Sequence, residues 1–297
     1  MNHRNRGRPL RLLTLALALF SCERFEGARK LSPVPVSPAD GPSNAEEELP
    51  DLAAAIASLT GRDTYTEPSA LAAIIDRADL PPDLAFRLKT AAAENPAFIM
   101  DLMECLNGDP FLRRLVDKTR PLPPGYEPED LVDLEPGSYE LGRQGMKLRR
   151  AAAEGLEKMA AAARSQGIVL VASSAYRSYD YQVQVYNRIV GELGQEAADR
   201  ESARPGHSQH QTGLALDFGS IDDSFAQTRV GRWIKENGSR FGWSISFPDG
   251  YEAVTGYRWE SWHYRYVGED LAAFIDTWFG GIQQYALQFI HAWEEAG

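Results

Sequence analysis

The feature that most constrains the fold is a proline-rich break in the middle of the chain, TRPLPPGYEPEDL at residues 119–131. Four prolines in thirteen residues stop both helices and strands, because proline fixes φ and lacks the N–H donor. Before the break, apolar residues recur at helical spacing, as in SALAAIIDRADL and NPAFIMDLMECL. The sequence therefore predicts a small all-helical module over residues 49–119 and a different domain from residue 120 onwards.

Beyond the break, helical patterns alternate with short strand-like runs. The alanine-rich segment 144–167 is typical of a helix stopped by Gly167, and IVLVASSA follows it as a β-branched run. GLALDF, WSISF and the end of RWESWHYRYV also have strand character. These patterns predict an α+β domain over residues 120–268, with a small antiparallel sheet flanked by helices. A C-terminal helical extension, 269–297, is interrupted at Gly280 and Gly281.

The N-terminus is typical of an exported protein. Four arginines precede the short apolar run LLTLALALF, which is too short to span a bilayer as a helix and indicates a secretory signal over residues 1–22. The run ends in LFSC, which resembles a bacterial lipobox with Cys22 as the lipidated residue; the alternative is a plain signal peptide with an incidental cysteine. We expect a lipid anchor on the periplasmic face of a bacterial membrane. Residues 23–48, rich in Pro, Ser, Asp and Glu, are expected to form a flexible linker.

Charge and cysteine content narrow the possible functions. The net charge of −11 argues against a nucleic-acid-binding protein, which normally carries a basic patch. The two cysteines, Cys22 and Cys105, provide no disulfide framework if Cys22 is lipidated. Cys105 lies in an apolar helical pattern and is expected to be a buried small hydrophobe.

Three of the five histidines occur in two short stretches, GHSQHQTGLALD at 206–217 and ESWHYRY at 260–266. Imidazole and carboxylate groups are those that a catalytic zinc site uses, with three protein ligands and one open position. The chain contains no HExxH motif, so such a site would have to be assembled from separate segments. The alternative is that these are ordinary packed or surface histidines, and spacing alone does not decide between the two. The candidate residues are His207, His210, Asp217, Glu260 and His263.

The spacing of these residues constrains how a site could form. His210 and Asp217 are seven residues apart and would lie on opposite faces of one straight strand, but Gly213 permits a turn between them. Glu260 and His263 fit best with the glutamate on a loop and the histidine inside the following strand.

Three blocks of this sequence together resemble a known family. SQHQTGLALDF, ESWHYRY and SSAYRSYDYQ are similar to the SxHxxGxAxD, ExxWH-type and Tyr-Arg-Ser signatures of the zinc D-alanyl-D-alanine carboxypeptidases related to VanY. The blocks occur in the family order, and the resemblance runs from about residue 120 to 268. Ala175 stands where the family often has glycine, a small departure.

The resemblance implies a role for each matched residue. It implies that His210, Asp217 and His263 bind one zinc ion and that Glu260 is the catalytic base, whereas His207 falls at a variable position and is not a ligand. General base catalysis by a carboxylate beside zinc agrees with this assignment. The planar guanidinium of an arginine also suits a free terminal carboxylate. The residues implied to contact the substrate are Arg177, Gln182 and Ser208.

The function implied is that of a zinc metallocarboxypeptidase that removes the terminal D-alanine from peptidoglycan stem peptides. We expect the protein to be a monomer. The family also contains L,D-carboxypeptidases that trim tetrapeptide stems, and no residue here separates the two types. A catalytically silent, wall-binding lipoprotein is a further alternative, against which the presence of all four zinc and base residues counts.

Overall fold

A computed structural model describes residues 68–296 of the chain. The predicted signal segment 1–22 with Cys22, the predicted linker 23–48 and the start of the predicted helical module lie outside the described residues. Within residues 68–296, no helix is both long and apolar enough to cross a membrane.

Between residue 68, where the described part begins, and the proline-rich break, the chain forms three helices. They are α2 (Pro68–Arg77), α3 (Pro82–Glu94) and α4 (Pro96–Asn107). Proline in the first turn suits α3 and α4, because the missing N–H has no partner inside the helix there. Asn95 caps α4 by accepting a hydrogen bond from the N–H of Ala97.

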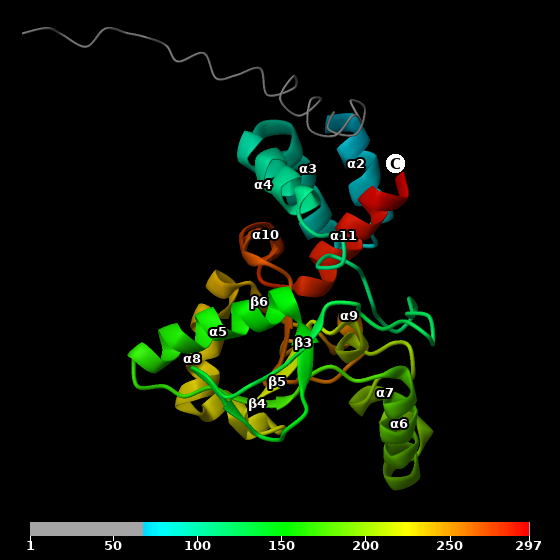
Figure 1. Ribbon diagram of the computed structural model, residues 1–297. Coiled ribbons are helices and arrows are strands. Elements are labelled where there is room, and N and C mark those ends of the chain that lie inside the picture. Colours follow the sequence, from blue (N-terminus) through cyan, green and yellow to red (C-terminus); the bar gives the residue numbers. More distant parts are fainter. Residues whose placement is uncertain (1–67, 297) are drawn as a thin grey trace, which may run out of the picture. The chain divides into compact units, whose positions relative to one another are not determined.

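The domain after the break is built on a five-stranded sheet with the order β2-β4-β5-β7-β6. Figure 1 labels β4, β5 and β6 of this sheet. Its strands are β2 (Glu140–Leu141), β4 (Val171–Ser174), β5 (Ala215–Phe218), β6 (Trp243–Ile245) and β7 (His263–Tyr266). The predicted antiparallel pairing holds for β4–β5, β5–β7 and β6–β7, but β2 pairs with β4 in parallel. The parallel pair arises because the chain crosses over through a helix between these two strands.

The crossover helix is α5 (Arg150–Ser165), which directly follows β3 (Lys147–Arg149). Strand β3 pairs with β1 (Leu131–Asp133) in a separate two-stranded sheet. Leu156 and Met159 of α5 are buried in one hydrophobic core with Leu216 and Phe218 of β5. The other helices of this part are α6 (Tyr179–Leu193), α7 (Gln195–Glu201), α8 (Arg229–Asn237) and α9 (Glu252–Thr255), with 3₁₀ turns η1 (Gln209–Thr212), η2 (Asp223–Gln227) and η3 (Gly238–Phe241).

The two ends of the described chain share a second hydrophobic core. Helices α10 (Glu269–Phe279) and α11 (Gln283–Ala296) pack with α2, α3 and α4. The ring of Phe98 lies 5.7 Å from that of Phe274 and 6.0 Å from that of Phe289, between centroids. The described parts of the predicted separate module (49–119) and of the predicted C-terminal extension (269–297) therefore contribute to one hydrophobic core. Sequence patterning missed this because it does not show which apolar face packs on which.

Helix α8 packs closely on the turn that follows β5, and this contact requires a glycine. A Cβ atom built on Gly231 would lie 2.1 Å from the carbonyl oxygen of Phe225, a backbone atom that also accepts from Thr228. We expect Gly231→Ala to lower the free energy of unfolding by about 1–3 kcal/mol, because the helix must move away from the turn. Chemical denaturation measures the change.

Gly191→Ala is the matched control, since a Cβ at Gly191 in helix α6 would meet no atom within 4 Å. This substitution should stabilise the chain by up to about 1 kcal/mol through helix propensity. Equal stability of Gly231→Ala and the wild type would show that helix α8 does not pack closely on the Phe225 carbonyl.

Candidate zinc site

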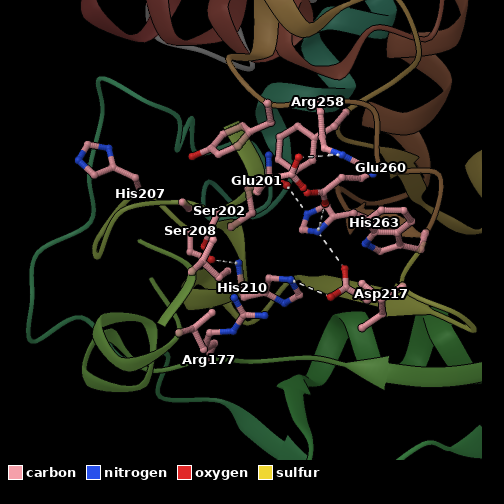
Figure 2. A pocket seen from close by; sticks show the side chains of 18 of the residues that line it. Arg177, Glu201, Ser202, His207, Ser208, His210, Asp217, Arg258, Glu260 and His263 are labelled. Carbon is pink, nitrogen blue, oxygen red and sulfur yellow. Dashed lines mark hydrogen bonds and ion pairs between the residues drawn. The ribbon is translucent and has the colours of Figure 1, made fainter. Parts of the chain in front are cut away.

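A pocket of about 420 Å³ opens over the ends of β5 and β7 and brings the predicted site residues together (Figure 2). All of the candidate residues except Gln182 line this pocket. The candidate residues that line it are Arg177, His207, Ser208, His210, Asp217, Glu260 and His263.

Three structural elements position the predicted zinc ligands. Asp217 in β5 and His263 in β7 are direct antiparallel partners, so their side chains leave the same face of the sheet. His210 lies in the turn η1, and Gly213 ends this turn in the left-handed conformation with φ of 71°. The turn predicted at Gly213 is thus present, and it lets His210 and Asp217 approach one point.

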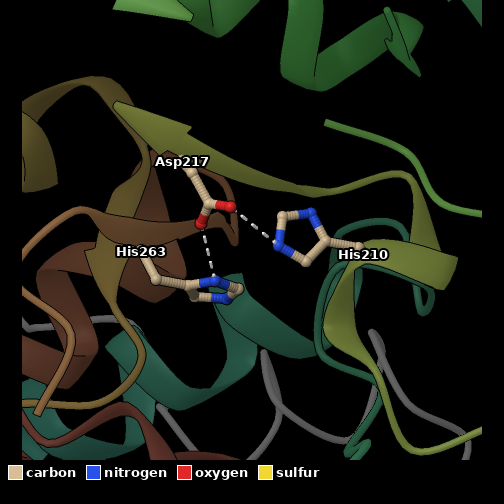
Figure 3. Close-up of side chains that lie close together, drawn as sticks. All are labelled: His210, Asp217 and His263. Atoms are coloured by element: carbon tan, nitrogen blue, oxygen red, sulfur yellow. Dashed lines mark hydrogen bonds and ion pairs between the residues drawn. The ribbon is translucent and has the colours of Figure 1, made fainter. Parts of the chain in front are cut away.

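The three side chains converge in a buried cluster (Figure 3). Nδ1 of His263 lies 3.0 Å from Oδ1 of Asp217, and Nε2 of His210 lies 3.3 Å from Oδ2 of the same carboxylate. One ligand atom from each residue lies within 4.8 Å of the others. Two imidazoles and one carboxylate at this separation fit the three-ligand set of a catalytic zinc site, which keeps a fourth position open.

Hydrogen bonding and burial prepare the ligands for a metal. Nδ1 of His210 lies 2.8 Å from the carbonyl oxygen of Ala175, to which it donates, so Nε2 carries the free lone pair. Burial lowers the pKa of His210 to about 4, which keeps this imidazole in the neutral, metal-binding form at neutral pH. Burial alone would raise the pKa of Asp217, but the facing imidazoles outweigh it and hold the pKa well below its usual range.

Glu260 lies beside the cluster on the loop before β7, as the sequence predicted. Its Oε2 is 3.7 Å from Nδ1 of His263, and its backbone N–H donates to the carbonyl of Phe247. Burial raises the pKa of Glu260 to about 7. A carboxyl group with a pKa near neutrality can both accept and release a proton, which suits a general base that later acts as an acid.

Gln182 has a different position from the one predicted. Its side chain is fully buried and does not line the pocket. Its Oε1 accepts from the guanidinium of Arg177 at 2.8 Å, while its Nε2 donates to the carbonyl of Ala203 at 2.6 Å. The structure thus places Gln182 behind Arg177, where it fixes the arginine, because both ends of its amide already have protein partners.

His207 lines the pocket away from the cluster, and its Nδ1 is 2.7 Å from the backbone oxygen of Asp117.

Sequence reasoning missed two further residues. The side-chain oxygen Oε1 of Gln209 lies 3.2 Å from Nε2 of His263. The one sequence feature that could have indicated Gln209 is its position next to His210. Arg258 lines the pocket and forms ion pairs with Glu201 and Asp223. No local sequence pattern predicted these ion pairs.

The α+β fold and the buried His-Asp-His cluster with an adjacent glutamate define a metallohydrolase of the single-zinc type. Residues 145–269 match the family model described as VanY, D-alanyl-D-alanine carboxypeptidase. A D-alanyl-D-alanine carboxypeptidase of Enterococcus faecalis (strain ATCC 700802 / V583) is 30% identical over 218 residues, which cover 69% of this chain and 78% of that protein. The chain belongs to the VanY family.

Two solved structures are similar to this chain. One is a mutant of the vancomycin-resistance D,D-pentapeptidase VanY from a VanB-type cassette, in complex with Zn(II). Its TM-score is 0.51 at 30% identity, over 60% of this chain and 99% of that one. The other is the LD-carboxypeptidase LdcB, with a TM-score of 0.51 at 34% identity, over 57% of this chain and 85% of that one.

Arg177 provides a test of the substrate side of the pocket. Its guanidinium is held by Gln182 and by the hydroxyl of Ser174 at 3.3 Å, while its Nε has no protein partner among the described residues. We expect Arg177→Lys to lower kcat/KM by about 10–100-fold, because an ammonium group cannot reproduce two charge-assisted hydrogen bonds in a plane. Peptide cleavage kinetics measure the loss.

Arg188→Lys is the control, since Arg188 lines the outer part of the same pocket with a largely exposed side chain. It should leave kcat/KM close to the wild-type value. Zinc content should be unchanged in both variants. Wild-type kinetics for Arg177→Lys would remove Arg177 from the site.

Proposed function

We propose that this protein is a zinc-dependent carboxypeptidase that removes the terminal D-alanine from peptidoglycan stem peptides. The observation that carries the proposal is the buried cluster of His210, Asp217 and His263 with Glu260 beside it. A zinc ion held by these three ligands would polarise the scissile carbonyl and make an attacking water more acidic.

The chain's own residues account for the other steps. Glu260 takes the proton from the attacking water at a carboxylate oxygen and passes it to the leaving amine. Arg177 is placed to bind a carboxylate or a developing negative charge, since Gln182 and Ser174 orient its guanidinium. Ser208 is buried and lines the same pocket, which supports a role for it in contacting the peptide.

The D,D specificity is supported by the matched family description and by the D,D-pentapeptidase VanY among the similar structures. The L,D-carboxypeptidase alternative has a specific observation in its favour, because LdcB is equally similar in fold. A silent wall-binding protein is the least supported reading, since the catalytic glutamate and all three ligands are present together.

A cleavage assay on the purified full chain, combined with metal analysis, tests the proposal. A synthetic stem pentapeptide and a tetrapeptide are supplied separately, and D-alanine release is measured. We expect one zinc ion per chain and faster release from the pentapeptide. Faster release from the tetrapeptide would assign the L,D type, whereas zinc without release from either peptide would favour the wall-binding alternative.

We also propose that the protein is exported, carries a lipid on Cys22 at the periplasmic face of a bacterial membrane, and acts there as a monomer. The support is the basic and apolar start of the chain and the LFSC sequence. Mass spectrometry of the mature N-terminus tests the modification, with Cys22→Ala as the control. An unmodified mature terminus would leave a plain signal peptide.

A further inference from the structure

Helix α11 reaches the zinc site through a chain of side-chain amides. Gln283, on the first turn of α11, is 1% exposed and lies outside the residues 145–269 that match the family model. Its Nε2 donates to the carbonyl oxygen of Ser244 at 3.1 Å. Its Oε1 accepts from Nε2 of Gln209 at 3.5 Å, and Oε1 of Gln209 lies 3.2 Å from Nε2 of His263.

The direction of the hydrogen bonds in this chain of amides is fixed at Gln283, the end far from the metal ligands. A backbone carbonyl can only accept, so the Gln283 amide must turn its NH₂ group toward Ser244 and its oxygen toward Gln209. Gln209 must then turn its own NH₂ group toward Gln283 and its oxygen toward His263. An oxygen at this place requires that Nε2 of His263 carries the proton, and the lone pair is therefore on Nδ1.

Nδ1 is the nitrogen of His263 that faces Asp217 in the cluster, at 3.0 Å from Oδ1. The hydroxyl of Ser246 also donates a hydrogen bond to Oε1 of Gln209, at 2.6 Å, so this oxygen has a second donor besides His263. Gln209, Ser246 and Gln283 are all buried, so bulk water does not compete strongly for these amides.

We propose that Gln283 and Gln209 are positioning residues that fix the tautomer and the ring orientation of His263, so that helix α11 is a functional part of the zinc site. The inference rests on the zinc site of the proposed function. It gives the C-terminal helix a role in metal binding in addition to its role in the helical core.

The zinc affinity of the full chain, measured by competition with a chelator, tests the inference without using activity. Gln283→Leu and Gln209→Leu should each weaken zinc binding by about 10–100-fold, the usual effect of losing a partner behind a metal-binding histidine. Gln284→Leu is the matched control. Gln284 is the next residue on the same helix, is also buried and donates to Asp117 at 3.0 Å, so this variant should bind zinc like the wild type.

Rescue separates tautomer control from general damage to the fold. A carboxylate at position 209 accepts a hydrogen bond from the Nε2–H of His263 with either oxygen and needs no amide to orient it. Zinc binding by the double variant Gln209→Glu/Gln283→Leu should therefore return close to that of the wild type. Circular dichroism melting checks that each variant is folded, and Gln209→Leu carries the test if Gln283→Leu is not.

Three results would overturn the inference. They are wild-type zinc affinity in the folded leucine variants, an equal loss in Gln284→Leu, and no rescue by Gln209→Glu. The absence of zinc from the wild-type chain would instead contradict the proposed function itself, so the two failures are distinguishable.

Discussion

Glu260→Gln is expected to reduce kcat by about 10²–10⁴-fold while one zinc ion per chain stays bound. Glutamine keeps the size and the hydrogen-bonding reach of the side chain but cannot accept the proton of the attacking water. Zinc should remain because the ligand cluster consists of three other residues, which the substitution does not alter. Metal analysis and steady-state kinetics on the same preparation give both values.

Glu201→Gln is a matched control for this prediction. Glu201 lines the same pocket, but its carboxylate is half exposed and forms an ion pair with Arg258 at 3.2 Å. An exposed ion pair contributes about 0–1 kcal/mol, so kcat should stay near the wild-type value. If Glu260→Gln retained wild-type turnover, the general base would have to be another group.

Asp217→Asn is expected to weaken zinc binding by more than about 100-fold and to abolish activity. Losing a residue that only supports a metal ligand already costs up to about 100-fold in metal affinity, so losing a ligand itself should cost more. The carboxylate is the only anionic member of the ligand cluster and lies between both imidazoles, at 3.0 Å and 3.3 Å. A neutral amide of the same shape loses the charge that attracts a divalent cation. Chelator competition measures the affinity.

Asp222→Asn is the control, because Asp222 is an aspartate of the same pocket whose carboxylate caps η2 by accepting from Ser224. It should leave zinc binding unchanged. Removing the metal from the wild-type chain with a chelator should abolish activity, and one equivalent of zinc should restore it. Restoration of Asp217→Asn by one equivalent would show that the carboxylate is not a ligand.

Much of the site could be predicted from the sequence, because its residues lie in compact motifs. His210, Asp217 and His263 were predicted as ligands from the family resemblance, and they converge in the structure. The local geometry was also accessible, since a glycine at residue 213 permits the turn that brings the first two together. Strands β4, β5, β6 and β7 and helix α5 followed from apolar patterns that act over a few residues, whereas the short strands β1, β2 and β3 were not predicted.

Other features depended on contacts between distant residues. The parallel pairing of β2 with β4 depends on the path of the chain through α5, which residue spacing does not report. Gln182 resembles a substrate contact by its position in a motif, yet the fold places it behind Arg177 with both ends of its amide bonded. The role inferred for Gln283 joins residues 74 positions apart and could not be derived from sequence spacing.

The sequence by itself determined the chemical groups of the site, the order of the longer helices and of the strands β4 to β7, and the family. These depend on residue type and on periodicities that each segment carries within itself. Only the tertiary structure decided that helices α2, α3 and α4 form one core with α10 and α11, and which amides lie behind Arg177 and His263. Apolar faces bury against whichever surface complements them, and a buried amide bonds to whatever polar atom lies in reach, so both outcomes exist only once the whole chain has packed.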